Sequence, residues 1–276
     1  MKLTMKLTIL GSMGWIPVRD QHTCCYCLEY GDTLIIFDAG TGMARFSESW
    51  ARDILASYEK ILILLSHYHL DHTLGLMYLT HSFKDKEIHI AGPGPSVYGR
   101  GVRDILSTLI APPLFGRSIT EFPMEIRFHD LGAGTTRIEG IQVDAILQEH
   151  SDPSLGIKIE DHVCYITDTP CREATVEFAR DCKLLLHETW FDSYDYEELL
   201  RAAKESGTHP AVLKDLKSHS PVKLVADIAV RAAPAELVLI HLNPGYEENR
   251  LLAMEREAQD IFPRAHLARD GQVFEL

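Results

Sequence analysis

The sequence lacks any long apolar segment. It contains no run of 18 apolar residues, whereas a helix that crosses a bilayer needs about 20. Near the N-terminus the apolar stretch LTIL ends at Gly11, which is too short for the core of a signal peptide. We therefore expect no membrane partner.

Basic residues are also scarce. The chain has 27 Lys and Arg against 40 Asp and Glu, which gives a net charge of −13. A long polyanion is usually held by a basic surface, so long nucleic acid is an unfavourable partner for this chain. A small anionic substrate bound at a local positive site remains compatible with the charge.

The six cysteines lack the paired C-x-x-C spacing of a zinc ribbon, and a chain of this length needs no disulfide framework. Cys24, Cys25 and Cys27 lie in a pattern of two strands joined at Gly31-Asp32. Successive strand side chains point to opposite faces, so a shared metal ion is the less favoured interpretation. We expect buried, reduced thiols and a cytoplasmic protein.

No linker rich in Gly, Ser or Pro interrupts the chain, which predicts a single domain over residues 1–276. Strand patterns occur in both halves with helices between and after them, which indicates two sheets covered by helices. The predicted helices occupy residues 43–58, 73–83, 96–110, 195–206, 221–232 and 247–261. In the first of these, an apolar residue recurs at every fourth position, at Phe46, Trp50, Ile54 and Tyr58.

Four apolar strand patterns each end on a side chain that can bind a metal. The run ILILL leads into SHYHLDH at residues 66–72, and three later strands end at His150, Asp168 and His241. In α/β sheets, ligands gather beyond the carboxyl ends of the strands. These side chains are therefore candidates for one common site.

The spacing within SHYHLDH has a geometric reason. If the loop starts extended, His67 and His69 point the same way and can share one ion, whereas Asp71 and His72 follow the turn and aim at a second. Two divalent ions about 3.5–4 Å apart form a common hydrolytic centre. Imidazoles with carboxylates suit zinc best, with manganese or iron as alternatives. Leu70 and Tyr68 alternate with the ligands and are expected to be packing residues.

The joint pattern resembles the metallo-β-lactamase-fold hydrolases over almost the whole chain. The resemblance is carried by the ligand order and by the segments GSMGW, FDAGTG, YITDT, LLLHETWF and SHSP. It implies a four-layer αβ/βα sandwich. The family's redox branch has a glutamate where this chain has His69, so the resemblance favours hydrolysis.

Residue by residue, the resemblance implies a dinuclear centre. It assigns one ion to His67, His69 and His150, the other ion to Asp71, His72 and His241, and a bridging position to Asp168. Strand-end aspartates of the family lie beneath the histidine loop, which makes Asp38 a candidate to hold the imidazoles.

Within the family, HETWF and SHSP resemble the branch that contains ribonuclease Z and the phosphonate-pathway cyclic phosphodiesterase. This implies that His219 contacts substrate or acts as a general acid, oriented by Glu188, and that Asp71 helps to orient the nucleophile. The alternative for His219 is a residue that only begins a helix. Ribonuclease Z carries a long tRNA-binding arm between the ligands that match His150 and Asp168, and here 168 − 150 = 18 residues leave no room for it.

These features predict a dinuclear metal-dependent hydrolase that acts on a small phosphodiester through a metal-bridging hydroxide. The alternatives are hydrolysis of a carboxylic ester, thioester or lactone, tRNA 3′ processing, and a non-catalytic metal-binding subunit. We expect a small anionic substrate and a homodimer as partners. The loops at 111–116 and 190–196 are candidates for the walls or lid of the site.

Overall fold

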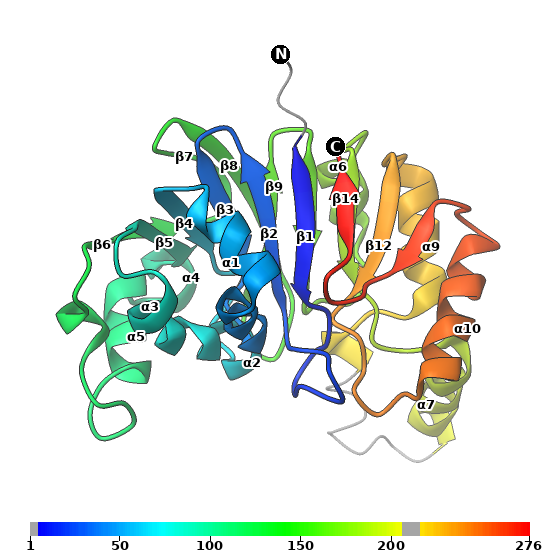
Figure 1. The fold of residues 1–276 in the computed structure, drawn as a ribbon. Coiled ribbons are helices and arrows are strands. Elements are labelled where there is room, and N and C mark those ends of the chain that lie inside the picture. The colour runs from blue at the N-terminus through cyan, green and yellow to red at the C-terminus, as the bar shows by residue number, and fades with distance from the viewer. Residues whose placement is uncertain (1–4, 206–215) are drawn as a thin grey trace. The chain divides into compact units, whose positions relative to one another are not determined.

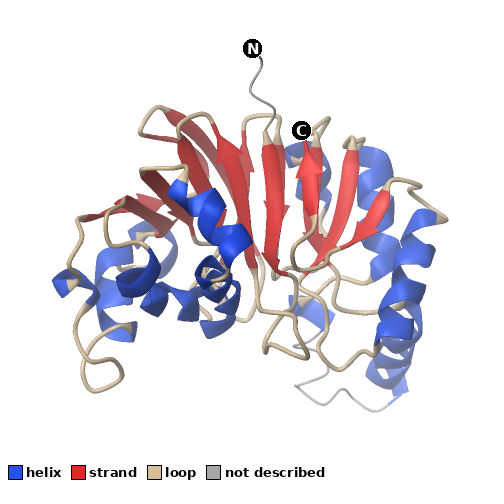
Figure 2. Ribbon diagram, viewed as in Figure 1, coloured by secondary structure: helices blue, strands red, loops and turns tan. Residues whose placement is uncertain are grey.

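The computed structural model describes residues 5–205 and 216–276, which form two compact units. The first unit comprises the chain up to Ser12, Pro17–Gly132 and Arg269–Leu276, and the second comprises Met13–Ile16 and Ala133–Ala268. Each unit contains one seven-stranded mixed sheet together with helices (Figures 1 and 2). Two sheets covered by helices are the architecture that the sequence predicted.

The sheet of the first unit has the strand order β14-β1-β2-β3-β4-β5-β6. Strands β14 to β3 pair antiparallel, and β3 to β6 pair parallel, so the loops after β3 and β4 leave the same edge of the sheet. The strands are β1 (Lys6–Gly11), β2 (Cys25–Tyr30), β3 (Thr33–Phe37), β4 (Lys60–Leu64), β5 (Glu87–Pro93), β6 (Ile126–Leu131) and β14 (Val273–Glu275).

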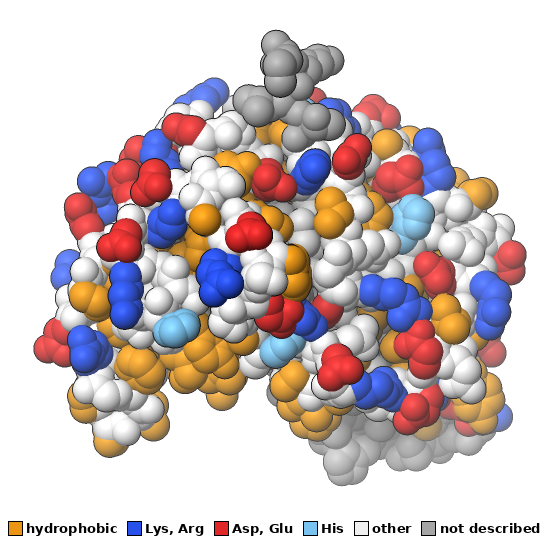
Figure 3. Space-filling view, viewed as in Figure 1, with side chains coloured by type: hydrophobic (Ala, Val, Ile, Leu, Met, Phe, Trp, Pro, Cys, Tyr) orange, Lys and Arg blue, Asp and Glu red, His pale blue; other side chains and the backbone are white. Residues whose placement is uncertain are grey.

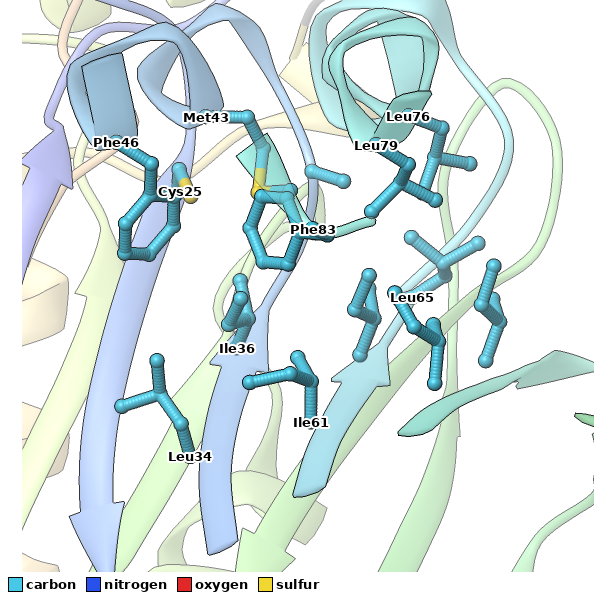
Figure 4. Close-up of a cluster of buried hydrophobic side chains, with 14 of the residues drawn as sticks. Cys25, Leu34, Ile36, Met43, Phe46, Ile61, Leu65, Leu76, Leu79 and Phe83 are labelled. Carbon is cyan, nitrogen blue, oxygen red and sulfur yellow. The ribbon is translucent and has the colours of Figure 1, made fainter. Parts of the chain in front are cut away.

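Short helices cover one face of this sheet. They are the 3-10 helix η1 (Thr41–Ser47), α1 (Ser49–Ala56), α2 (Leu70–Thr73), η2 (Leu74–Tyr78), α3 (Leu79–Ser82), α4 (Pro95–Tyr98), α5 (Val102–Leu109) and η3 (Ile119–Glu121). Figure 4 shows side chains from η1, η2 and α3 facing those of β3 and β4. Phe46 and Phe83 meet edge-on with ring centroids 5.2 Å apart. Each large apolar side chain buried here contributes about 1.5–3 kcal/mol of transfer free energy.

The sheet of the second unit has the order β13-β12-β11-β10-β9-β8-β7, with β7 to β10 antiparallel and β10 to β13 parallel. Helices α6, α9 and α10 pack together against it. Its strands are β7 (Gly134–Ile138), β8 (Ile141–Gln148), β9 (Ser154–Ile159), β10 (Val163–Ile166), β11 (Leu184–Glu188), β12 (Glu236–Ile240) and β13 (Ala265–Leu267). Its helices are α6 (Glu173–Phe178), α7 (Ser193–Glu205), α9 (Val222–Ala232) and α10 (Glu248–Gln259).

Some predicted helices are wrong in detail. The helix expected over 43–58 is interrupted at the extended residue Glu48. Of the four residues of the predicted stripe, Phe46, Ile54 and Tyr58 pack into the core of this unit and Trp50 does not. Trp50 is 36% exposed, and Ala51 and Leu55 are buried in its place. The helix expected over 73–83 consists of three short helical pieces, and the one over 96–110 is divided at Gly99, which has φ +68. Residue 206, the last of the helix predicted over 195–206, lies outside the described residues.

The predicted burial of the cysteines in the hairpin is confirmed. Cys24, Cys25 and Cys27 are fully buried, and no disulfide joins any of the six cysteines. Burial raises the pKa of the Cys27 thiol to about 12, which keeps it protonated. Among the described residues, no helix has the length and apolar character to cross a membrane.

Candidate metal centre

In the first unit, the motif SHYHLDH begins where the chain leaves β4. His69 has an extended backbone and precedes α2, whose first turn carries Asp71 and His72. The ring centroid of His67 lies 4.4 Å from that of His69 and 4.3 Å from that of His72. The Nε2 atom of His72 lies 3.2 Å from Oδ2 of Asp71. The turn from strand to helix thus gathers these four side chains.

Asp38, the residue after β3, holds this loop from below. Its side chain is fully buried. It accepts hydrogen bonds from the Ser66 amide at 2.7 Å, from the Ser66 hydroxyl at 2.7 Å and from Nδ1 of His72 at 2.6 Å. The contact predicted for Asp38 beneath the histidine loop is therefore present.

These bonds also set the tautomers of two histidines. His72 donates from Nδ1 to Asp38, so its Nε2 lone pair is available to a metal. The single hydroxyl hydrogen of Ser66 goes to Asp38, so Nδ1 of His67, 3.0 Å from that hydroxyl oxygen, must donate to it. His67 therefore also presents Nε2 as a lone pair.

In the second unit, Asp168 lies two residues beyond β10 and faces a histidine with each oxygen. Its Oδ2 lies 3.2 Å from Nε2 of His150, and its Oδ1 lies 3.3 Å from Nε2 of His241. His150 donates from Nδ1 to the Ser218 carbonyl at 3.2 Å, which leaves Nε2 to bind metal. Asp168 thus contacts one histidine with each of its carboxylate oxygens.

His241 is packed closely by the loop that carries GSMGW. The Gly14 amide donates to the Leu242 carbonyl at 3.0 Å. A Cβ atom at Gly14 would lie 2.5 Å from Cε1 of His241, well inside van der Waals contact. Position 14 therefore requires glycine so that the imidazole can keep its place.

His219 and Glu188 lie beside this group. Nδ1 of His219 donates to Oε2 of the fully buried Glu188 at 3.0 Å, and Trp190 stacks on the His219 ring with centroids 4.7 Å apart. Burial raises the pKa of the Glu188 carboxyl, and the neighbouring His219 acts against that rise. The ligand atoms of Asp168, His219 and His241 all lie within 4.8 Å of one another.

Three residues of these groups have left-handed backbone. The φ angles are +53° at Asp38, +49° at Asp168 and +50° at His241. Each residue stands one or two positions beyond a parallel strand, where the chain turns sharply away from the sheet. Residues other than glycine rarely adopt this backbone conformation, and such residues are concentrated at functional sites.

The donor atoms fit divalent metal ions. Ligands bound to one zinc ion at about 2.0–2.2 Å in a tetrahedron lie roughly 3.3–3.6 Å apart. The Asp71–His72, His150–Asp168 and Asp168–His241 separations are 3.2, 3.2 and 3.3 Å. The donors of these three pairs are imidazole nitrogens and carboxylate oxygens, a set that suits zinc, manganese or iron.

Comparisons with known proteins agree with this geometry. Residues 33–242 match the family model described as a beta-lactamase superfamily domain. A ribonuclease Z of Synechococcus sp. (strain WH7803) is 27% identical, with 96% of this chain and 94% of that protein covered. The crystal structure of the metallo-beta-lactamase fold protein YhfI from Bacillus subtilis has a TM-score of 0.72 at 20% identity, covering 99% of this chain and 100% of that one. A diphosphatase from the PhnP family has a TM-score of 0.66 at 16% identity, covering 99% and 98%.

Two mixed sheets with helices and the clustered histidines and aspartates at their strand ends define a metal-dependent hydrolase. The chain belongs to the beta-lactamase superfamily and has the metallo-β-lactamase fold.

One site prediction is wrong, and other contributors were missed. Leu70, expected to be a packing residue, is 56% exposed, because it begins α2 on the side away from the core. Ser66 was not predicted, and Trp190 was predicted only as part of the loop at 190–196. The serine precedes the first ligand and the tryptophan lies in the HETWF segment, but neither residue type indicates a role without its three-dimensional neighbours.

Proposed function

We propose that this protein is a dinuclear metal-dependent phosphodiesterase that acts on a small phosphodiester. The proposal takes the ligand assignment from the resemblance. The first ion takes His67, His69 and His150, the second takes Asp71, His72 and His241, and Asp168 serves both. Zinc is the proposed metal, because the donors are mainly imidazoles.

The observation that carries the proposal is the bond between His219 and Glu188. A buried carboxylate that accepts from Nδ1 leaves Nε2 of His219 as the atom that can hold or release a proton. The histidine lies within 4.8 Å of proposed metal ligands, where the leaving oxygen of a bound substrate would need a donor. This is the arrangement of a general acid oriented by a carboxylate.

Divalent ions bound here would supply a Lewis acid and lower the pKa of a coordinated water to about 7. The chain's own residues would do the rest. Asp38 and Ser66 accept from Nδ1 of His72 and His67, so that Nε2 of each imidazole could bind a metal. Asp71 would orient the attacking water. His219 would give its Nε2 proton to the departing alkoxide, so that a phosphodiester and water become a phosphomonoester and an alcohol.

Two observations weigh against tRNA as the substrate. The net charge is −13, which disfavours a long polyanion. The alignment with the Synechococcus ribonuclease Z runs over 326 positions and this chain has 276 residues, so at least 326 − 276 = 50 positions have no counterpart here. A precursor tRNA cleavage assay would test this alternative directly.

Hydrolysis of a carboxylic ester, thioester or lactone is the second candidate, because the same metal ligands could serve a carbonyl centre. Purified protein loaded with zinc or manganese should be assayed on bis-p-nitrophenyl phosphate beside a panel of esters and lactones, with metal content measured on the same sample. We expect two ions per chain and phosphodiester turnover. Turnover of carboxylic esters alone would refute the phosphodiesterase assignment.

The single domain over 1–276, the cytoplasmic location and the homodimer stay predictions. Sedimentation of the purified protein checks the last of these.

A further inference from the structure

The first unit contains a small apolar pocket beside the histidine loop. Its volume is about 200 Å³. One wall is formed by Leu70, Leu74 and Met77 of α2 and η2, and the other by Leu109 at the end of α5 and by Leu114 and Phe115 of the loop at 111–116. Figure 3 shows hydrophobic side chains gathered at the lower edge of this unit, below α3 and α5 of Figure 1.

The side chains that line the pocket are almost all hydrophobic. Thr73 is the one polar residue among the eight that line the pocket, and its hydroxyl donates to the His69 carbonyl at 2.9 Å. A sugar or a nucleobase placed here would leave its polar groups without partners, which costs free energy. The pocket therefore selects for an apolar group.

The rim of the pocket is apolar and exposed to water. Leu114 is 74% exposed and Leu70 is 56% exposed, although both are large hydrophobic residues. The ring centroids of Phe115 and Phe122 lie 5.9 Å apart, and this contact holds the loop at 111–116 that forms one wall of the pocket. A guest that covered the two leucines would remove apolar surface from water, which is favourable.

The size of the pocket identifies its occupant. A cavity of about 150 Å³ lined by apolar side chains holds one benzene molecule, whereas an α-helix with its side chains is about 10–12 Å across. At about 200 Å³ the pocket accepts one six-membered ring or a branched alkyl group of similar size, and no helix of a partner protein.

The wall of the pocket adjoins the proposed metal ligands in the sequence. Leu70 stands between His69 and Asp71, and Thr73 directly follows His72. Neighbouring Cα atoms are about 3.8 Å apart, so the wall of the pocket begins one residue from three ligands. A ring attached to the reacting phosphoester or carboxylic ester group is therefore a candidate occupant.

We propose that this pocket binds a ring-sized apolar group of the substrate. The substrate would then be an anionic phosphodiester in which one ester group is aryl or branched alkyl. The inference rests on the proposed function and narrows its substrate class. It favours aryl phosphodiesters over cyclic nucleotides and over sugar cyclic phosphates.

The test compares phenylphosphonate with methylphosphonate, which bind without being hydrolysed. Titration calorimetry on the zinc-loaded full chain should give at least about tenfold tighter binding of the phenyl compound, since a few carbons in a fitting pocket have effects of that size. Leu114→Asn removes an apolar wall at an exposed position, and Met77→Trp fills the cavity. Both should bring the phenyl-to-methyl ratio of affinities towards one and leave methylphosphonate binding unchanged. Leu224→Asn, on α9 and 40% exposed, is the matched control and should keep the ratio of the unmodified protein.

Failure of this inference is distinguishable from failure of the proposed function. If no phosphodiester is hydrolysed but the phenyl preference is present and falls in both pocket variants, the pocket assignment stands and the reaction assignment falls. If phosphodiesters are hydrolysed but the wild-type ratio is near one, or neither variant changes it, the pocket assignment is overturned. Absence of any phenylphosphonate binding also overturns it.

Discussion

Asp38→Asn should weaken metal binding without unfolding the protein. The asparagine carbonyl can still accept from the Ser66 amide, but an amide NH₂ takes the place of Oδ2, which now accepts from His72 at 2.6 Å. To accept from that NH₂, His72 must move its proton from Nδ1 to Nε2. The proton then occupies the atom that faces Asp71 at 3.2 Å and that is proposed to bind the metal.

The size of the effect follows from the bond that is lost. A metal that keeps Nε2 forces two donors to face each other, which removes a charge-assisted hydrogen bond of about 1.5–3 kcal/mol. About 2 kcal/mol corresponds to a roughly 30-fold loss of metal affinity, since each 1.4 kcal/mol is a factor of ten. The backbone should not change, because asparagine tolerates the left-handed conformation that Asp38 adopts.

Competition with a chromogenic chelator measures the affinity, and thermal unfolding of the metal-free protein measures the fold. Asp53→Asn, at an exposed position of α1, is the matched control and should match the unmodified protein in both. Unchanged metal affinity in Asp38→Asn would refute the tautomer argument. So would a loss of affinity that merely follows unfolding of the metal-free chain.

Three further changes test other parts of the site. His219→Ala should lower phosphodiester turnover by about 10²–10⁴ and leave metal content intact, and equal rates would exclude a general acid at this position. Gly14→Ala should displace the His241 imidazole and lower metal affinity, whereas Gly116→Ala, where a Cβ meets open space, should not. Burial lowers the pKa of His187 to about 4 from 6.5, so the unfolded chain takes up a proton between these values that the folded chain does not. The stability due to this residue is therefore complete above pH 6.5 and falls by up to about 3 kcal/mol as the pH drops to 4. His187→Leu should flatten that part of the urea-unfolding profile of the metal-free protein, and an unchanged slope would contradict the assignment.

The ligand candidates could be predicted from the sequence because each follows an apolar strand pattern, and β4, β10 and β12 have parallel neighbours whose carboxyl ends lie at the same edge of the sheet. His150 instead follows β8, which pairs antiparallel with both of its neighbours. His67, His150, Asp168 and His241 all stand one to three residues beyond a strand. Their assignment to particular ions came from the resemblance to a family, since spacing alone does not determine which ligands share an ion.

What the sequence did not reveal depends on contacts between distant residues. Strand β13 has only three residues, Ala265–Leu267, which are too few for a periodic pattern to be recognised. Trp50 departs from the predicted stripe because the extended Glu48 interrupts the helix just before it. Trp190 stacks on a histidine 29 positions away in the chain, since 219 − 190 = 29, and no local pattern encodes that contact.

The left-handed backbone at Asp38, Asp168 and His241 lowers thermal stability, whereas the side chains at these positions are proposed to be needed for metal binding. Glycine at any of these positions would relax a conformation that costs on the order of 1 kcal/mol or more, while removing a group on which metal binding is proposed to depend. Selection of variants for heat resistance alone should therefore enrich glycine or asparagine at positions 168 and 241, but not glycine at position 38, where three buried hydrogen bonds would be lost. The selected variants would have higher thermal stability and would no longer bind the metal ions.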